Sequence, residues 1–200
     1  MRSLLTTALL TLAVVTQTQA ATPIAAGKYN LDPMHSKVGF EVAHLVISSV
    51  EGKFKNFSGV LTVDDKFEKS KVEAEIDISS VDTSVKDRDD HLKSPDFFDA
   101  AKYPKMTFKS TSISGTPESF KLTGDLTLKG KTQKVTFTGS YKGSAVDGYG
   151  NTKAAFNASA KISRKEFGLT WNKLVEVGPV VGDEITIDLK LQGAKEVAKK

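Results

Sequence analysis

The sequence predicts an all-β protein, an extended antiparallel barrel of eight or nine strands with one short helical insert. Apolar residues recur at every second position through most of the chain, which is the period of a strand with one buried face. Strands buried on both faces of a parallel sheet would show continuous apolar runs, so the alternation favours antiparallel pairing. Several segments are long, which suits a barrel better than a sandwich, although the alternation by itself fits both.

The strands follow from this alternation, segment by segment. In the first clear one, Val38, Phe40 and Val42 alternate with polar or small residues. The same pattern is found at residues 71–78, 120–128, 134–141, 156–162 and 185–191. Less regular candidates lie at 28–32, 53–63 and 105–112. Glycine-containing turns are expected at 129–131 and 148–151, because glycine tolerates the backbone angles of tight turns.

The inward-facing rows combine phenylalanines with small residues. The small ones are Ala74, Gly139, Ala158 and Ala160. An eight-stranded barrel is just wide enough inside for side chains or one small ligand. A filled core is the simpler interpretation of any single ring. Taken together, the rings and the small residues suggest a pocket.

Residues 83–104 interrupt the pattern and predict a helical insert. Residues 85–92 lack the strand period and predict one or two helical turns. Ser94 and Pro95 then predict a second short helix through Ala101, since serine caps helix starts and proline fits the first helical position. That helix should end before Pro104. The insert would be a lid or plug, or equally a plain crossover that covers one barrel end.

The first twenty residues have the layout of a secretory signal peptide. Arg2 supplies a positive charge, residues 4–15 are mainly apolar, and cleavage is expected after Ala20. The apolar run is too short to cross a bilayer as a helix, which needs about 20 residues. We therefore expect export, to the periplasm or beyond, of one domain at 22–193 with a frayed tail at 194–200.

Composition argues against several functions. The chain has no cysteine, and its 28 cationic and 24 anionic residues are interleaved, so neither a thiolate site nor a nucleic-acid surface is indicated. No motif nominates a catalytic residue. His35 and His44 are nine residues apart and would face opposite sides of one strand. The acidic cluster at 87–91 could hold a metal, but a solvated helix face explains it better, so no metal or cofactor is expected.

Several motifs resemble the YceI-like family, and the resemblance spans essentially the whole mature chain. They are YNLDP at 29–33, HSKVGF at 35–40, GKF at 52–54, DRDDHLKSPDFFD at 87–99, LTGDLTLKG at 122–130, RKEFGL at 164–169 and VGDEI at 181–185. The resemblance implies a lipocalin-like, eight-stranded barrel whose tunnel holds a long amphiphile. Polyisoprenoid lipids, such as prenyl phosphates or quinones, are the ligands it implies. It also implies a periplasmic homodimer without established catalysis.

Strand parity and these motifs together assign site residues. Contacts to the lipid tail are expected from Val38, Phe40, Val42, Phe108, Phe137, Phe156, Ile162, Ile187 and Leu189. Mouth or lid roles are expected for His91, Phe97, Phe98, Tyr103, Arg164, Phe167 and Trp171. The leading hypothesis is an exported carrier that sequesters an isoprenoid-type lipid. An enzyme acting on such a lipid, with His91 or His44 as base, and an interaction module with a filled barrel are the alternatives.

Overall fold

The structure is a computed structural model that describes residues 23–176 and 178–196. The predicted leader at 1–20 lies outside these residues. Eleven strands form one sheet, and two very short strands form a separate hairpin. The sheet strands are β1 (Gly27–Leu31), β2 (Lys37–His44), β3 (Ser48–Phe54), β4 (Phe57–Val63), β5 (Lys71–Asp77), β6 (Val81–Asp82), β7 (Lys105–Thr116), β8 (Ser119–Leu128), β9 (Lys131–Val146), β10 (Thr152–Ser163) and β13 (Val181–Lys195). The hairpin pairs β11 (Leu174–Val175) with β12 (Gly178–Pro179).

The sheet closes into an eight-stranded antiparallel barrel, as the sequence predicts. Its order is β1-β4-β5-β7-β8-β9-β10-β13, and β13 pairs back onto β1. At three positions in the wall, a second strand continues the line of a barrel strand. Strand β2 continues β1, strand β3 continues β4, and strand β6 continues β5. All six clear alternating segments, and the three less regular candidates, contribute to strands.

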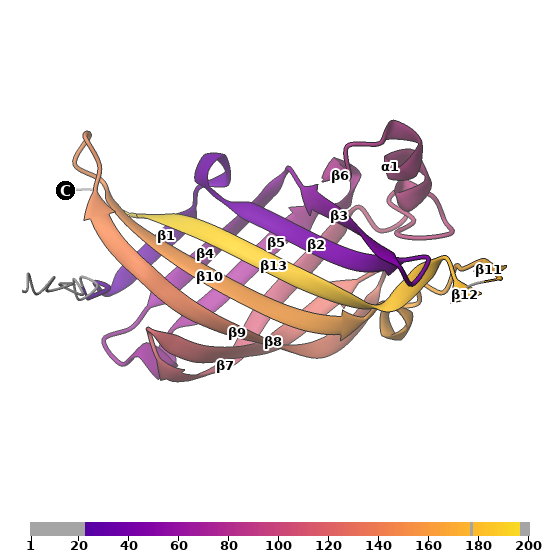
Figure 1. Cartoon of the computed structure of the whole chain (residues 1–200). Helices are drawn as coiled ribbons and strands as arrows, with labels where there is room; N and C mark the ends of the chain where they lie inside the picture. The colour runs from indigo at the N-terminus through magenta and orange to yellow at the C-terminus, as the bar shows by residue number, and fades with distance from the viewer. Residues whose placement is uncertain (1–22, 177, 197–200) are drawn as a thin grey trace, which may run out of the picture.

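The two ends of the barrel differ in what covers them (Figure 1). We call one the helix end: it carries the connections at 45–47, 83–104, 129–130 and 164–180, with α1 (Lys86–Lys93), η4 (Arg164–Phe167) and the β11–β12 hairpin. The other we call the terminal end, because residues 23–26 and 196 lie there with the turns at 64–70, 117–118 and 147–151. Two short 3-10 turns lie elsewhere in the wall, η1 (Pro33–His35) and η3 (Ile78–Ser80), and a third, η2 (Phe67–Lys69), lies at the terminal end.

The helical insert is only partly as predicted. Residues 86–93 form α1, but the second helix expected from Ser94 onward is absent, and residues 95–98 form turns. Ser94 ends α1 instead of starting a helix, because its N–H donates to the His91 carbonyl at 3.1 Å. Asp99 then has a φ of 52°, a left-handed conformation that a helix cannot contain. The C-terminal boundary also shifts, since β13 continues to Lys195 and includes residues 194–195 of the expected tail.

Glycines on the strands are occupied by rings rather than left as space. A Cβ on Gly139 would lie 2.4 Å from the Phe120 ring, and one on Gly124 would lie 2.4 Å from the Phe108 ring. The expectation that Gly139 leaves room for a ligand is therefore wrong: the neighbouring ring lies flat over its backbone. Ala74 and Ala158, in contrast, do border open space inside the barrel.

Candidate functional site

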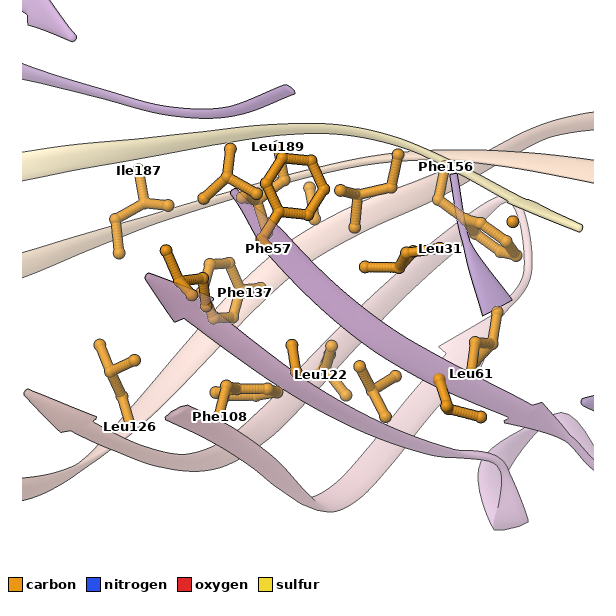
Figure 2. Close-up of a pocket in the computed structure, with 18 of the residues that line it drawn as sticks. Leu31, Phe57, Leu61, Phe108, Leu122, Leu126, Phe137, Phe156, Ile187 and Leu189 are labelled. Atoms are coloured by element: carbon orange, nitrogen blue, oxygen red, sulfur yellow. The ribbon is translucent and has the colours of Figure 1, made fainter. Parts of the chain in front are cut away.

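The barrel encloses an apolar cavity of about 140 Å³ in its central part. Figure 2 shows its lining as carbon-only side chains from many strands of the barrel. The lining residues include Leu31, Val38, Phe57, Leu61, Ala74, Ile76, Phe108, Leu122, Leu126, Phe137, Phe156, Ala158, Ile187 and Leu189. Among the described residues that line the cavity, only Ser58 has a polar side chain and none is charged. A hydrocarbon can be buried against this surface, whereas a polar group of a ligand would find no charged partner there.

The energetics of such a cavity favour one class of ligand. Burial contributes about 0.8 kcal/mol for each methylene group, so a long hydrocarbon gains much from entering. An ion inside would lose its hydration without a compensating hydrogen bond. The cavity is smaller than the roughly 300–1,000 Å³ of drug-sized pockets, so a long chain fits only if lining side chains move. The lining rings, such as Phe57 and Phe137, are the groups whose rotation would enlarge it.

Six of the nine predicted tail residues line the cavity. They are Val38, Phe108, Phe137, Phe156, Ile187 and Leu189. The other three point inward elsewhere or border another surface. Phe40 packs on Phe54 with ring centroids 5.8 Å apart, Val42 lies toward the helix end, and Ile162 borders a groove between β9 and β10. The role of all nine as ligand contacts stays a prediction.

Sequence reasoning missed much of the β4 and β5 side of the cavity. Phe57 and Leu61 lie in the segment 53–63, whose alternation is broken, and Phe67 lies in η2 outside any strand. The break has a local cause, because residues 55–56 separate β3 from β4 and shift the parity of the row. The row of Val72, Ala74 and Ile76 was visible in the sequence and could have been assigned by parity alone.

All seven predicted mouth residues gather at the helix end, but none lines the cavity. Phe97, His91 and Trp171 form a cluster of mutually contacting rings, with centroids 5.0–5.1 Å apart. Phe98 packs on Phe54 with ring centroids 5.9 Å apart, and Phe167 is fully buried. Tyr103 packs against Gly130 at the β8–β9 turn. The cluster closes this end of the barrel as a plug, and a lid role for these residues stays a prediction.

Arg164 belongs to this plug as a structural residue. Its side chain is buried and donates hydrogen bonds to the carbonyls of Gly182 at 2.8 Å, Leu169 at 2.6 Å and Trp171 at 2.8 Å. Burial lowers the pKa of Arg164, and the Asp183 carboxylate opposes that change. The planar guanidinium of Arg164, which has five N–H donors, thus stabilises the connection from η4 to β13 by hydrogen-bonding its backbone carbonyls.

The terminal end is closed by a second, smaller cluster that the sequence did not reveal. Tyr29 is fully buried there and packs with Val63, Tyr141 and Ala154. The Tyr29 hydroxyl donates to the Ala25 carbonyl at 2.7 Å. Burial, followed by the neighbouring Tyr141, raises the pKa of Tyr29.

The acidic cluster of α1 is engaged in contacts within the helix region. Asp90 pairs with Lys86 and Lys93, and the Asp89 carboxylate accepts hydrogen bonds from Thr83. Within residues 23–176 and 178–196, no group of three His, Cys, Asp or Glu side chains lies close enough to hold a metal. None of the helices in those ranges combines the length and hydrophobicity needed to cross a bilayer.

Comparisons with known proteins match this architecture. A family model described as "YceI-like domain" matches residues 29–193. Protein YceI of Salmonella newport is 35% identical over 187 residues, which cover 93% of this chain and 95% of that protein. Among solved structures, Burkholderia cenocepacia BcnA superposes with a TM-score of 0.72 at 28% identity, covering 81% of this chain and 98% of that one. A polyisoprenoid-binding domain from Saccharophagus degradans, implicated in plant cell wall breakdown, shares the fold with a TM-score of 0.65 at 14% identity over 86% of this chain and all of that one.

The family match rests on the same residues that build the barrel. It begins in β1 and ends within β13, so it includes every strand of the closed wall and both plugged ends. Together with the relative that is similar along almost its whole length, this shows that the chain belongs to the YceI family.

Proposed function

We propose that this protein binds the apolar tail of a long-chain, isoprenoid-type lipid inside the barrel and carries or sequesters it. The observation that supports this most is the internal cavity, whose lining is apolar apart from Ser58. A cavity of this kind discriminates by hydrophobicity and shape rather than by charge. The polyisoprenoid-binding domain of Saccharophagus degradans has the same fold, which agrees with this ligand class.

The proposal includes the setting in which the protein works. It is exported to the periplasm after cleavage behind Ala20, pairs as a homodimer, requires no cofactor and performs no catalysis. The apolar side chains of Ile47 and Leu174, each at least 80% exposed at the helix end, are a surface suited to pairing. Light scattering during size-exclusion chromatography tests the dimer, and Leu174→Asp should yield monomers. Tyr149→Asp at the terminal end is the matched control, and an unchanged dimer in Leu174→Asp would contradict this surface.

The ligand itself is tested by native mass spectrometry of protein purified from its own host. We expect a bound mass that organic extraction removes and that added polyprenol or prenyl phosphate restores. Incubating the reloaded complex and then measuring the mass of its bound lipid separates a carrier from an enzyme. A carrier leaves the mass of the lipid unchanged. A protein that arrives empty and takes up none of the added lipids would contradict the proposal.

A further inference from the structure

The barrel wall is interrupted between its first two long strands. β1 pairs with β4 up to Asn30 opposite Val60, and β2 pairs with β3 from Val38 opposite Phe54 onward. Residues 31–37 and 55–59 lie between these two ladders, and the register pairs no residue of one with a residue of the other. We call this interval the wall break. One side carries two more residues than the other, and these bulge outward as η1 (Figure 1).

Each side of the wall break forms hydrogen bonds with the neighbouring segment on the side away from the break. On the η1 side, the Asp32 N–H donates to the Gln192 carbonyl at 2.8 Å, and the Ser36 hydroxyl accepts from the Gln192 N–H at 2.9 Å. On the other side, the Asn56 N–H donates to the hydroxyl of Ser80 at 3.0 Å. These bonds hold each edge of the wall break in place without bridging the break itself.

Phe57 is the side chain that separates the cavity from the outside at this position. It lines both the internal cavity and an external groove of about 600 Å³. Figure 2 labels it among the side chains that line the cavity. Met34 lies on the outer rim of the same groove and is 87% exposed, an unusual exposure for a large apolar residue. Phe57 is therefore the side chain that the groove and the cavity have in common, and Met34 is an apolar contact on the outer side of it.

The groove outside Phe57 is polar and carries more lysines than acids. Its charged lining consists of Lys37, Lys53, Lys55, Glu51 and Asp82. A hydrogen bond from the Ser84 N–H, with help from Lys55 and Lys53, lowers the pKa of Asp82, so this carboxylate is ionised and pairs with Lys55 at 3.6 Å. In the described part of the chain, neither Lys37 nor Lys53 forms a direct ion pair, although Lys53 contributes to the field that lowers the pKa of Asp82. With three lysines against two acids, the groove keeps a net positive charge that would attract an anion.

The two barrel ends offer no comparable path. The helix end holds the buried Phe97, Phe167 and Arg164, and the terminal end holds the fully buried Tyr29. Opening either end would separate several packed rings or break the hydrogen bonds of Arg164. Opening the wall break requires rotation of the half-buried Phe57 and no loss of ladder hydrogen bonds.

We propose that the wall break is the portal of the barrel: the lipid tail enters past Phe57, and an anionic head group such as a phosphate stays outside against Lys37 and Lys53. This inference rests on the proposed function and deepens it, since it assigns the route and the charge of the ligand. A lateral portal also keeps the phosphate hydrated while the tail is buried, which avoids the cost of burying an ion.

Blocking the three candidate openings one at a time tests the route. The chain has no cysteine, so single cysteines can be labelled selectively. Met34→Cys, Leu174→Cys and Tyr149→Cys place a bulky maleimide at the wall break, the helix end and the terminal end, at sites that are all at least 80% exposed. Native mass spectrometry at successive times follows uptake of geranylgeranyl phosphate. The label at position 34 should slow uptake at least tenfold, and the other two should not.

The possible results separate the portal from the function. If unlabelled protein takes up the probe and a label at 174 or 149 slows uptake while one at 34 does not, the portal is wrong and lipid binding stands. If unlabelled protein takes up no probe, the proposed function fails and the portal with it. A second variant tests the gate: Phe57→Ala should speed both uptake and release of the probe severalfold, because it removes the ring that separates the cavity from the outside. Phe137→Ala removes a lining ring from the opposite wall, so it should weaken binding at equilibrium but leave the uptake rate unchanged. An equal rise in uptake rate in both variants would contradict a gating role.

The charge of the head group is tested by comparing geranylgeranyl phosphate with geranylgeraniol, which share one tail. We expect the unmodified protein to prefer the phosphate about tenfold and the variant Lys37→Gln/Lys53→Gln to lose most of that preference. Lys121→Gln/Lys142→Gln removes the same net charge from exposed positions on the far wall and should keep the preference. A preference that is unchanged in the first variant, or equally reduced in the second, would overturn the head-group assignment.

Discussion

At the scale of single residues, Arg164 shows what a motif and strand parity leave open about a charged side chain. Arg164 was expected at the mouth, where a guanidinium would suit a lipid phosphate. The structure instead buries it beneath the 164–182 connection, where its donors face backbone carbonyls. Sequence parity reveals that a residue points inward, but it does not reveal whether ligand or backbone will satisfy its hydrogen bonds. The wall residues and the group at the helix end were predictable for this reason, whereas the hydrogen-bond partners of Arg164 and the Tyr29 cluster at the terminal end were not.

Removing Arg164 should therefore cost stability rather than affinity alone. Arg164→Ala leaves several buried carbonyls without donors, and we expect a loss of about 3–5 kcal/mol in the free energy of unfolding. Arg164→Lys should recover only part of it, because an ammonium group cannot reproduce the planar fork. Urea unfolding curves measure this, with Lys161→Ala on the exposed face of β10, the strand that leads into η4, as control. Full stability of Arg164→Lys would show that charge alone suffices.

Asp77 borders the wall break, because its backbone N–H donates to the Asn56 carbonyl at 2.9 Å, and its carboxylate responds to pH. Its carboxylate accepts hydrogen bonds from the Ser79 N–H at 3.0 Å and the Ser79 hydroxyl at 2.8 Å, which lower its pKa. A pKa below the unfolded value of about 3.9 means that stabilisation is present above that pH and is lost as the pH falls through the folded-state pKa. Asp77→Ala should cost about 1 kcal/mol at neutral pH and nothing in strong acid. Unfolding at both pH values checks this, and a difference that persists in acid would contradict it. Asp65→Ala, in an exposed turn, is the control.

At the scale of elements, the positions of the strands were predictable. Which aromatic ring covers which glycine of a neighbouring strand was not. Period-two alternation located β5, β8, β9, β10 and β13 of the closed barrel, because each has one buried face, whereas β1, β4 and β7 came from the less regular candidates. The short helix after Ser94 was mispredicted, because the same residue type ends α1 when its N–H reaches back to His91. Gly139 was expected to leave space, but the Phe120 ring covers it, and the Phe108 ring covers Gly124 in the same way. Local residue preferences cannot distinguish these outcomes, since each depends on a neighbouring strand.

The pairing of Phe120 with Gly139 predicts a paired mutational effect. Gly139→Ala places a methyl group 2.4 Å from the Phe120 ring, and we expect a loss of about 1–3 kcal/mol in stability. Adding Phe120→Leu should relieve part of that loss, so that the double variant is more stable than the sum of the two single effects allows. Thermal or urea unfolding of the four proteins gives the coupling energy. Gly148→Ala, where a Cβ meets nothing within 4 Å, should be neutral; purely additive effects at 139 and 120 would refute the clash.

At the scale of the whole molecule, an apolar cavity inside a closed wall sets a conflict between stability and binding. An empty cavity costs packing energy, since its lining atoms lack contacts. A protein selected only for stability would fill it, and this chain keeps Ala74 and Ala158 at its border. The sequence indicated this reserve of space through its small residues. It could not give the size of the cavity, because that depends on the rotamers of rings contributed by several strands.

Filling the cavity should raise the stability of the empty protein and weaken its binding of lipid. Ala158→Leu adds three carbon atoms at a position that is only 9% exposed and borders the cavity. We expect the empty protein to gain about 0.5–2 kcal/mol in stability, the usual range for cavity filling. Binding should weaken most for long tails, because a shorter prenol needs less of the space. Unfolding of lipid-free protein and competition between short and long prenols measured by native mass spectrometry test both halves. Ala145→Leu, on the exposed face of β9, should change neither quantity. A variant that gains stability yet binds long tails as well as before would place the ligand elsewhere, because added carbon in the cavity cannot coexist there with an unchanged tail.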